Sequence, residues 1–430
     1  MKGSHAASVS VTAIALALVL CTTGCAALPI AAAGRHASAG RPASGAAPAQ
    51  TIQQAISDRA QRATIAFDAL GFLTGSLGSD SFFPPGKVAD FWGFQYLRDH
   101  DPSQMGHNTD FLTKAALNMY SVLTTAQRAR LRALAVAQAP TINDYAYERF
   151  TLMEAFRRLL AGDVPAGTTG LDEAAVKKYS AQLYRIDGQM SYDRAAVYGP
   201  MLASLSVSQR ARLGAMVGKG MTSWPSVTEP ADMRGLSRDQ KVAVMTYAGD
   251  LYAWYAGSLD ADVYFCPERH GTYFGSFYLK DAPAVGNAGY SIPTTATADM
   301  GDNFINTLDA TQATLVTGVV STQKPDLLSI VDIRRRVAQQ LRLFKEGKRA
   351  NESTVLGLME RYGELDGDIA YQYATAFCAV DKTLTAAQKL QLTQYRTQLV
   401  GSLEPTGAYL YAQPIPMPRA ADTDFLFGVK

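Results

Sequence analysis

Residues 64–99 read TIAFDALGFLTGSLGSDSFFPPGKVADFWGFQYLRD, and residues 246–281 read TYAGDLYAWYAGSLDADVYFCPERHGTYFGSFYLKD. The two segments align without a gap at a constant offset of 182 residues, and this self-similarity indicates an internal duplication. Small, aromatic and acidic residues are shared: Asp68 with Asp250, Gly75 with Gly257, Pro85 with Pro267, Tyr96 with Tyr278, and Leu97 with Leu279.

The similarity continues downstream with small changes of offset. Arg149–Gly162 aligns with Arg334–Gly347, and Ile186-Asp187-Gly188 aligns with Leu365-Asp366-Gly367. The chain is therefore expected to hold two related copies of similar length, joined by a linker that contains Pro and Gly. The predicted segments are a signal peptide at 1–25, a flexible tether at 26–50, a first repeat at 51–222, a linker at 223–240 and a second repeat at 241–430.

Apolar residues recur at steps of three and four along much of both copies, which is the helical period. No long alternation of polar and apolar residues indicates a large sheet. We predict an all-α fold of two tandem pseudo-symmetric helical-bundle repeats with short loops. The residues that carry the period are Leu131, Leu134, Phe150, Met153, Phe156, Leu159 and Leu160 in the first copy, and Val331, Ile333, Val337, Leu341 and Phe344 in the second.

The N-terminus is typical of an export signal. Lys2 precedes an apolar stretch at Val11–Cys21 that is too short to span a bilayer in its own right. Thr22-Thr23-Gly24-Cys25 resembles a bacterial lipobox, with Thr22 where that motif has Leu. The resemblance implies that Cys25 is lipidated and that the mature protein is held in the cell envelope, at the periplasmic face of the outer membrane or at the cell surface. The alternative is a plain secretory signal, which also exports the chain.

The segment 26–50 is rich in Ala and Gly and has no aromatic residue, so it cannot bury enough surface to fold. The formal net charge of +2, with no basic run interleaved with aromatics, excludes nucleic acid as an expected partner. The membrane, reached through the lipid anchor, and an unidentified protein or small molecule are the expected partners. The sequence contains no Walker loop, Gly-x-Ser-x-Gly elbow, His-Glu-x-x-His or Rossmann fingerprint.

Segments beginning at Leu123, Leu205 and Leu384 share the pattern Leu-Thr/Ser-x-x-Gln. They resemble the LTxxQ motif of small periplasmic stress chaperones over five residues each. Physical chemistry favours a simpler interpretation, in which Thr or Ser and Gln form a capping box at a helix start. A degenerate fourth copy at Val319-Val320…Gln323 has no hydroxyl at the cap position, so that helix is expected to begin differently, at Ser321.

The densest group of reactive side chains lies in residues 262–281 of the second copy. Cys266 and His270 are four residues apart, a spacing that suits a metal ion or haem iron on a helical turn. The first copy has no such ligands at the aligned positions, so this group is specific to the second copy. The alternative is that the aromatics are core and His270 is an ordinary side chain. The ligand or metal candidates are Cys266, Glu268, His270, Tyr273 and Asp281.

Other residues form secondary candidates. Asp187 and Asp366, each followed by Gly, could act as paired carboxylates between the copies, or cap helices with Gly in the turn. His100 and His107 could ligate a metal from one loop, or be solvated. Cys266 and Cys378 remain after signal cleavage and could form a disulfide in an oxidising compartment, or stay as thiols.

The second copy carries an insertion around Ala282–Asp299 that is rich in Gly, Pro and Thr and is predicted to be a loop. The stretch CPERHGTYFGSFYLKDAP before and within it resembles secreted bacterial proteins with no assigned activity. Three functions remain open. The first is an exported binding or accessory protein with a ligand or partner site near the interface of the repeats. The second is a metal- or haem-dependent enzyme that uses Cys266, Glu268 and His270. The third is a periplasmic chaperone-like scaffold.

Overall fold

Helices dominate the protein: the described residues form eleven α-helices, and the predicted all-α class is confirmed. The computed structural model describes residues 57–74, 97–98, 114, 116–217, 223–256, 283–284, 287–291, 295–400, 407–410, 413–416 and 422–429. All of these belong to one compact unit, Ala32–Lys430. Within these residues, no helix has both the length and the apolar character needed to cross a membrane.

The helices are joined mostly by short turns. Two small antiparallel sheets accompany them, with strand orders β1-β4-β5 and β2-β3, and Leu97 of β1 pairs with Leu410 of β4. The helices are α2 (Asp58–Leu73), α3 (Ala116–Val122), α4 (Thr125–Ala161), α5 (Glu173–Ala203), α6 (Val207–Gly214), α7 (Arg238–Tyr255), α9 (Thr295–Thr307), α10 (Ala310–Thr317), α11 (Val319–Arg342), α12 (Glu352–Asp381) and α13 (Ala386–Val400). The short 3-10 helices are η4 (Ala231–Met233), η6 (Leu343–Glu346) and η7 (Asp424–Phe427), and the strands are β1 (Leu97–Arg98), β2 (Pro283–Ala284), β3 (Asn287–Ser291), β4 (Gly407–Leu410) and β5 (Gln413–Pro416).

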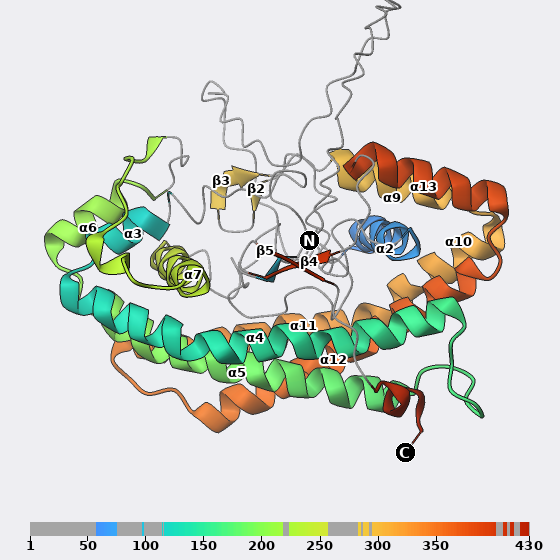
Figure 1. Ribbon diagram of the computed structural model, residues 1–430, viewed down its shortest axis with the longest axis horizontal. Helices are drawn as coiled ribbons and strands as arrows, with labels where there is room; N and C mark the ends of the chain where they lie inside the picture. Colours follow the sequence, from blue (N-terminus) through green and yellow to red (C-terminus); the bar gives the residue numbers. More distant parts are fainter. Residues whose placement is uncertain are drawn as a thin grey trace, which may run out of the picture. The chain divides into compact units, whose positions relative to one another are not determined.

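The two long helices α5 and α12 make the most extensive helix–helix contact among the described residues and run in opposite directions (Figure 1). They approach closely because glycine faces backbone at the crossing. A Cβ added to Gly363 would lie 2.7 Å from Cα of Ala181 and from the carbonyl oxygen of Ser180, and one added to Gly367 would lie 2.9 Å from Cα of Lys177. Any larger side chain at Gly363 would have to push the two backbones apart.

The first helices of the two halves of the chain, 51–222 and 241–430, pack in an unexpected way. Helix α2, near the start of the first half, packs against α9, α10, α11, α12 and α13 of the second half. Helix α7, at the start of the second half, packs against α3 and α4 of the first half. Figure 1 shows α2 beside α9 and α10 on the right and α7 beside α3 on the left. Helix contacts therefore cross the predicted linker in both directions.

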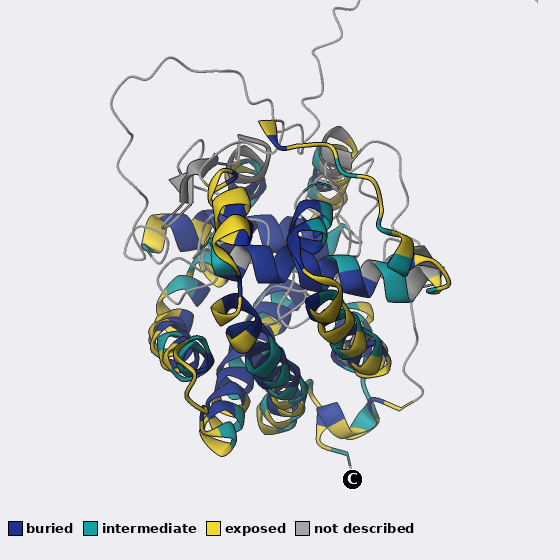
Figure 2. Cartoon of the chain, turned by 90° about the vertical axis from the view of Figure 1, so that its left-hand side faces the viewer, coloured by how far each residue is buried: buried dark blue, intermediate teal, exposed yellow. Residues whose placement is uncertain are grey.

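The core is formed by the inward faces of these helices, drawn dark blue in Figure 2. The helical period read from the sequence identifies much of it. Leu134 and Leu160 are the exceptions, since they are only partly buried and pack at the edge of the core. The predicted residues that are buried are Leu131, Phe150, Met153, Phe156, Leu159, Val331, Ile333, Val337, Leu341 and Phe344.

The capping interpretation of the Leu-Thr/Ser-x-x-Gln segments is confirmed. Thr124 and Gln127 form a capping box at α4, and Ser206 and Gln209 form one at α6. At α13 the amide of Gln388 donates to Thr385 Oγ1 at 3.2 Å, while the amide of Thr385 donates to Gln388 Oε1 at 2.9 Å. Each box pairs two backbone donors that a helix start would otherwise leave unpaired.

The degenerate segment Val319-Val320…Gln323 forms no capping box, as expected, but the predicted helix start at Ser321 is wrong. Two further boxes were not predicted. Ser237 and Gln240 form one at α7, and the other lies at α10, where Asp309 replaces the hydroxyl residue and Gln312 closes the box. Helix α11 begins at Val319 rather than Ser321, directly after α10 and without a side-chain cap. A search for a hydroxyl residue misses the box at α10 because a carboxylate accepts the same backbone hydrogen bond.

The predicted loop at Ala282–Asp299 is also only partly correct. Two short strands, β2 and β3, pair antiparallel within it, and α9 already begins at Thr295. The Gly- and Pro-rich composition gives the same signal for a hairpin as for an irregular loop, so it did not separate them.

Candidate functional site

One buried polar group joins α4, α5 and α7 and is called here the Arg194 cluster: Gln138, Arg194, Tyr198, Tyr247 and Asp250. Nη1 of Arg194 lies 3.2 Å from Oδ2 of Asp250, and both side chains are fully buried. The guanidinium carbon lies 4.3 Å from the centre of the Tyr247 ring. The Tyr247 hydroxyl donates to Gln138 Oε1, and the Tyr198 hydroxyl donates to the Tyr247 carbonyl at 2.9 Å. A buried charge pair of this kind needs its surrounding hydrogen bonds to offset desolvation.

The other buried polar group joins α2, α5, α11 and α12 and is called here the Asp68 cluster: Gln61, Asp68, Tyr184, Gln323, Asp366 and Tyr373. Gln323 donates to Gln61 Oε1 at 3.0 Å. Burial, and after it the charge of Asp68, raises the pKa of Tyr373 well above its usual value. Burial, and after it the charge of Asp366, does the same to the pKa of Tyr184. Both tyrosines therefore stay protonated and can donate hydrogen bonds.

Asp187 and Asp366 lie inside α5 and α12, so the interpretation that they cap helices is wrong. The caps are Asp172 and Asn351, at the starts of those helices. Gly188, which follows Asp187, is small because a Cβ there would lie 2.8 Å from Cβ of Met359. The Asp-Gly pair was mistaken for a turn because glycine serves close helix packing here.

The two carboxylates are also not brought together as an acid–base pair. Gly367, beside Asp366, faces Ser180 of α5, whereas Gly188 faces Met359 of α12. At a rise of ~1.5 Å per residue, Asp187 and Asp366 are separated by ~9 Å along the crossing. Asp187 accepts a hydrogen bond from Ser191 at 3.4 Å, and Asp366 belongs to the Asp68 cluster. The two carboxylates therefore lie in different polar surroundings.

A cavity of about 590 Å³ opens where α4 and α6 begin, and it is called here the α4–α6 cavity. Its described lining contains two arginines, four hydroxyl residues and two glutamines, and no acidic residue. The lining residues are Val122, Thr124, Ala126, Gln127, Arg130, Ser204, Ser206, Ser208, Gln209 and Arg212.

The glutamines of the two capping boxes hold this cavity together. Nε2 of Gln209 donates to Gln127 Oε1 and to the Val122 carbonyl, both at 2.8 Å, and Gln127 donates to Ser204 Oγ at 3.0 Å. The start of α4 is thus tied to the start of α6 and the end of α5. The cavity wall is a fixed arrangement in which both box glutamines are already bonded.

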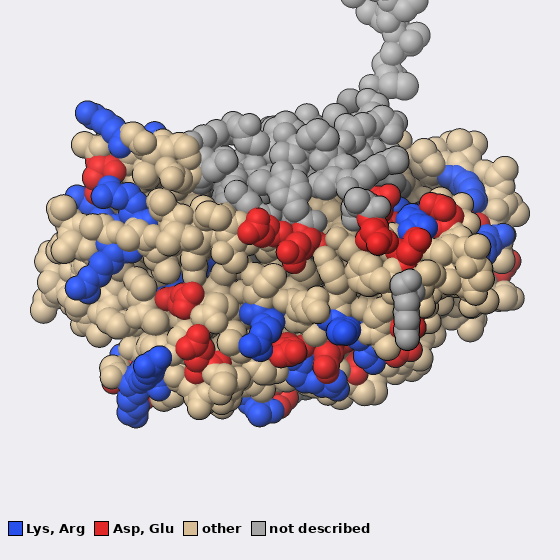
Figure 3. All heavy atoms as spheres, turned by 60° about the horizontal axis from the view of Figure 1, so that its bottom comes forward, with Lys and Arg blue, Asp and Glu red and all other residues tan. Residues whose placement is uncertain are grey.

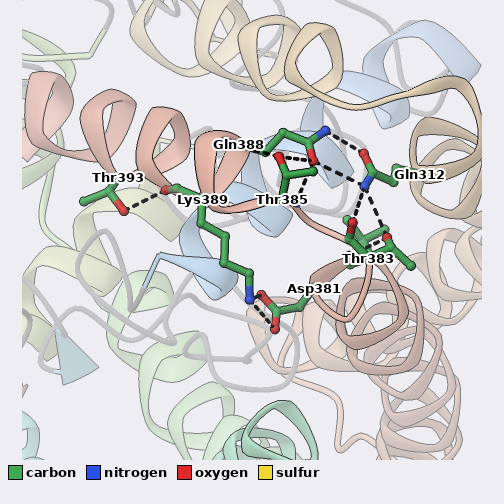
Figure 4. A network of polar contacts seen from close by, with 8 residues as sticks. Gln312, Asp381, Thr383, Thr385, Gln388, Lys389 and Thr393 are labelled. Carbon is green, nitrogen blue, oxygen red and sulfur yellow. Dashed lines mark hydrogen bonds and ion pairs between the residues drawn. The ribbon is translucent and has the colours of Figure 1, made fainter.

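The same contacts occur at the starts of α10 and α13 (Figure 4). Nε2 of Gln388 donates to Gln312 Oε1 at 2.8 Å and to the Thr307 carbonyl at 2.9 Å. Gln312 donates in turn to the Thr383 carbonyl at 2.9 Å. Nearby, Lys389 forms an ion pair with Asp381 at 2.9 Å. This hydrogen-bonded pair of glutamines, called here the glutamine joint, therefore connects two helix starts at both places: Gln127 with Gln209 and Gln312 with Gln388.

Arg130 and Arg212 differ from the arginines next to them. Arg128, two residues away and on nearly the opposite face of α4, forms an ion pair with Asp232 at 3.2 Å. Arg210 donates to the carbonyls of Leu202 and Ala203 at 2.7 and 3.1 Å. Among the described residues, neither Arg130 nor Arg212 has an acidic partner within ion-pair distance. Their guanidinium groups are available at the cavity.

Outside the cavity, basic and acidic side chains lie close together over much of the face drawn in Figure 3. Two ion pairs among the described residues link α5 to α12: Arg185 with Glu360 at 3.2 Å and Lys177 with Asp368 at 3.6 Å. Burial, and after it a hydrogen bond with Asp368, raises the pKa of Asp326 on α11 to about 7. This seam is charged but balanced, and it offers no patch of one sign.

Most of the candidates named from sequence lie outside the described residues. Within the described residues, no group of three or more His, Cys, Asp and Glu side chains is placed to hold a metal ion. Cys378 is buried in α12, and burial raises the pKa of its thiol to about 12. Its pairing with Cys266 stays a prediction, because Cys266 lies outside the described residues. The candidates outside the described residues are Cys25, His100, His107, Cys266, Glu268, His270, Tyr273 and Asp281.

Sequence reasoning missed the α4–α6 cavity, although the internal alignment held a signal for it. The box residues Gln127 and Gln209 align with Gln312 and Gln388, which are the same residue type. The arginines, by contrast, align with unlike residues: Arg130 with Leu315 and Arg212 with Gln391. Because the shared glutamines are flanked by arginines in the first half only, the two arginines indicate a feature that the second half does not have at the aligned positions.

Comparisons with known proteins add no relative. No protein-family model, no curated protein and no solved structure matches this chain. The functional argument therefore rests on the residues described above.

Proposed function

We propose that the chain is an exported, lipid-anchored binding or accessory protein that takes a small-molecule ligand in the α4–α6 cavity. The observation that carries this proposal is the cavity of about 590 Å³ itself, with its mixed lining of guanidinium groups, hydroxyls and apolar surface. Ligand sites are commonly concave, partly apolar and equipped with a few polar groups that fix orientation. The volume lies within the ordinary range for small-molecule sites.

The proposal includes the two-repeat architecture, with halves at 51–222 and 241–430. Its support is the recurrence of the same glutamine joint, Gln127 with Gln209 and Gln312 with Gln388, at positions that the internal alignment pairs. The halves are then interlocked rather than separate, because α2 and α7 each pack on helices of the other half.

Export and lipid anchoring rest on the N-terminal sequence, where Cys25 ends the lipobox-like Thr22–Cys25 segment. We expect Cys25→Ser to move the protein from the membrane fraction to the soluble fraction of its host. Cys21→Ser, four residues earlier at the end of the apolar stretch, is the matched control and should leave the protein with the membranes. Membrane association of the Cys25→Ser protein equal to wild type would exclude the anchor.

Binding at the cavity is tested by filling it. Ser208 lines the cavity and is exposed on α6, so Ser208→Trp should obstruct the cavity with little effect on the core. Lys178→Trp places the same side chain on an exposed position of α5, ~39 Å away along that helix from Ser204. A ligand that binds only the folded state raises Tm.

We therefore expect at least one compound in a panel of small metabolites to raise the Tm of the wild type and of Lys178→Trp, and to have no effect on Ser208→Trp. If no compound raises the Tm of the wild type, or if Ser208→Trp responds as the wild type does, the proposed function is wrong.

A further inference from the structure

We propose that the ligand of the α4–α6 cavity carries a phosphate or carboxylate group, which Arg130 and Arg212 bind together. This inference rests on the proposed function and adds the chemical class of the ligand. Guanidinium groups form paired, charge-assisted hydrogen bonds with planar or tetrahedral oxyanions, and such bonds are stronger than those between neutral groups.

The charge of the cavity favours an anion. Two of the ten described lining residues are arginines, and none of the ten is Asp or Glu. A ligand that carried a positive charge would meet two guanidinium groups with no compensating carboxylate in the described lining. A neutral ligand would leave both charges without a counter-charge in the bound state.

The arginines are available because the structure uses their neighbours instead. Asp232 forms an ion pair with Arg128 at 3.2 Å and lies 4.0 Å from Arg132. These two arginines are four residues apart on one face of α4, and Asp232 holds both of them. On α6, Arg210 is held by carbonyls at the end of α5. Arg130 and Arg212 make no comparable contact with the described residues and border the cavity.

The backbone amides at the helix starts are not the basis of this site. The amide of Gln127 donates to Thr124 Oγ1 and the amide of Gln209 donates to Ser206 Oγ, both at 3.2 Å. The glutamine side chains are used as well, since they bond to one another. The groups left to recognise a ligand are the two guanidinium groups, together with hydroxyls such as that of Ser208.

The second half of the chain provides an internal control. The glutamine joint is present there, at Gln312 and Gln388, but the residues aligned with Arg130, Ser208 and Arg212 are Leu315, Ala387 and Gln391. Leu315 is partly exposed on α10. The joint alone therefore does not require arginine, so the arginines are additional to the structural role of this region.

Isothermal titration of the mature protein with pyrophosphate, citrate and maltose tests the inference. The test variant, Arg130→Leu with Arg212→Gln, gives the first half the residues of the second. The control variant, Arg62→Leu with Lys178→Gln, removes the same charge from exposed positions on α2 and α5. We expect pyrophosphate, citrate or both to bind the wild type and the control with one site and to weaken as salt rises.

The test variant should bind the anion at least about tenfold more weakly, since two charge-assisted contacts are lost. Binding of pyrophosphate alone would assign a phosphate ligand, and binding of citrate alone would assign a carboxylate ligand. Absence of binding by both anions, or an equal loss in the control variant, would overturn the inference. A neutral compound that binds the wild type but not Ser208→Trp would overturn it while leaving the proposed function intact.

Discussion

The Arg194 cluster and the Asp68 cluster each contain a buried aspartate at aligned positions, but the side chain next to that aspartate differs. Asp250 and Asp68 occupy aligned positions when residues 64–99 are compared with residues 246–281, and both are buried. Arg194 of α5 forms an ion pair with Asp250, whereas Tyr373, at the aligned position of α12, lies near Asp68. The first cluster compensates the charge with a cation, and the second places the hydroxyl of Tyr373, rather than a cation, near the carboxylate of Asp68. The comparison teaches that the carboxylate itself can be retained while the chemistry around it changes.

The largest expected effect comes from removing Arg194. Arg194→Met leaves Asp250 buried without its cation, and we expect a loss of about 3–5 kcal/mol in the free energy of unfolding. Tyr373→Phe, at the aligned position, removes one hydroxyl and should cost about 1–2 kcal/mol. Denaturant unfolding followed by circular dichroism measures both.

The double variant Arg194→Met with Asp250→Leu separates charge from packing. It should recover most of the lost stability, because no buried charge remains. Equal losses for Arg194→Met and Tyr373→Phe would show that the two clusters do not differ as described.

The close contact between α5 and α12 at Gly363 gives the next largest effect. Gly363→Ala adds a Cβ within 2.7 Å of the α5 backbone, and we expect it to cost about 1–3 kcal/mol of unfolding free energy. Gly357→Ala, also on α12, meets no atom within 4 Å, and it should stabilise the helix by about 0.5–1 kcal/mol. Thermal unfolding of the two variants should therefore change Tm in opposite directions, and a shift in the same direction would contradict the close crossing.

The smallest expected effect is the pH dependence of the free energy of unfolding that Asp326 on α11 causes. The pKa of Asp326 is raised from its ordinary 3.8 to about 7 by burial and by Asp368, while Lys177 and Arg361 oppose the shift. The folded protein thus binds a proton more tightly than the unfolded chain, so stability falls as pH rises between those values. In the first half, Thr141 and Gln189 occupy the aligned positions.

Asp326→Asn should remove this decline, and the gain at neutral pH should be about 1 kcal/mol, because solvent screens a half-exposed group. Unfolding measured at several pH values between the two pKa values checks the slope. Thr141→Ala, at the aligned position, should leave the slope as in the wild type. A slope that is unchanged in Asp326→Asn would assign the pH dependence to other groups.

The features that sequence predicted well are local ones. The capping boxes depend on residues three positions apart, and the buried helix faces depend on a period of three to four residues. Both are readable within one window of sequence. The all-α class follows from the same short-range patterns. The Asp309 box was missed because a carboxylate takes the place of the hydroxyl, whereas the Ser237 box has the full Leu-Ser-x-x-Gln pattern and was overlooked.

The features that sequence missed depend on distant partners. Arg194 and Asp250 are 56 residues apart, and nothing near either residue identifies the other. Gly188 and Gly367 were assigned to turns, because a glycine needed for close helix packing carries no local sign that separates it from a turn glycine. The α4–α6 cavity requires α4 and α6 to meet through Gln127 and Gln209, a contact across 82 residues.

The exchange of α2 and α7 between the halves has a consequence for how the chain is made. Synthesis proceeds from the N-terminus, and α2 is among the first elements to leave the ribosome. Among the described residues, its main packing partners are α9 to α13, which are translated last, so these contacts cannot form until nearly the whole chain exists. Closing contacts over such long sequence separations is slow. Late packing of α2 is compatible with the proposed export, because a translocation pore accepts an unfolded chain.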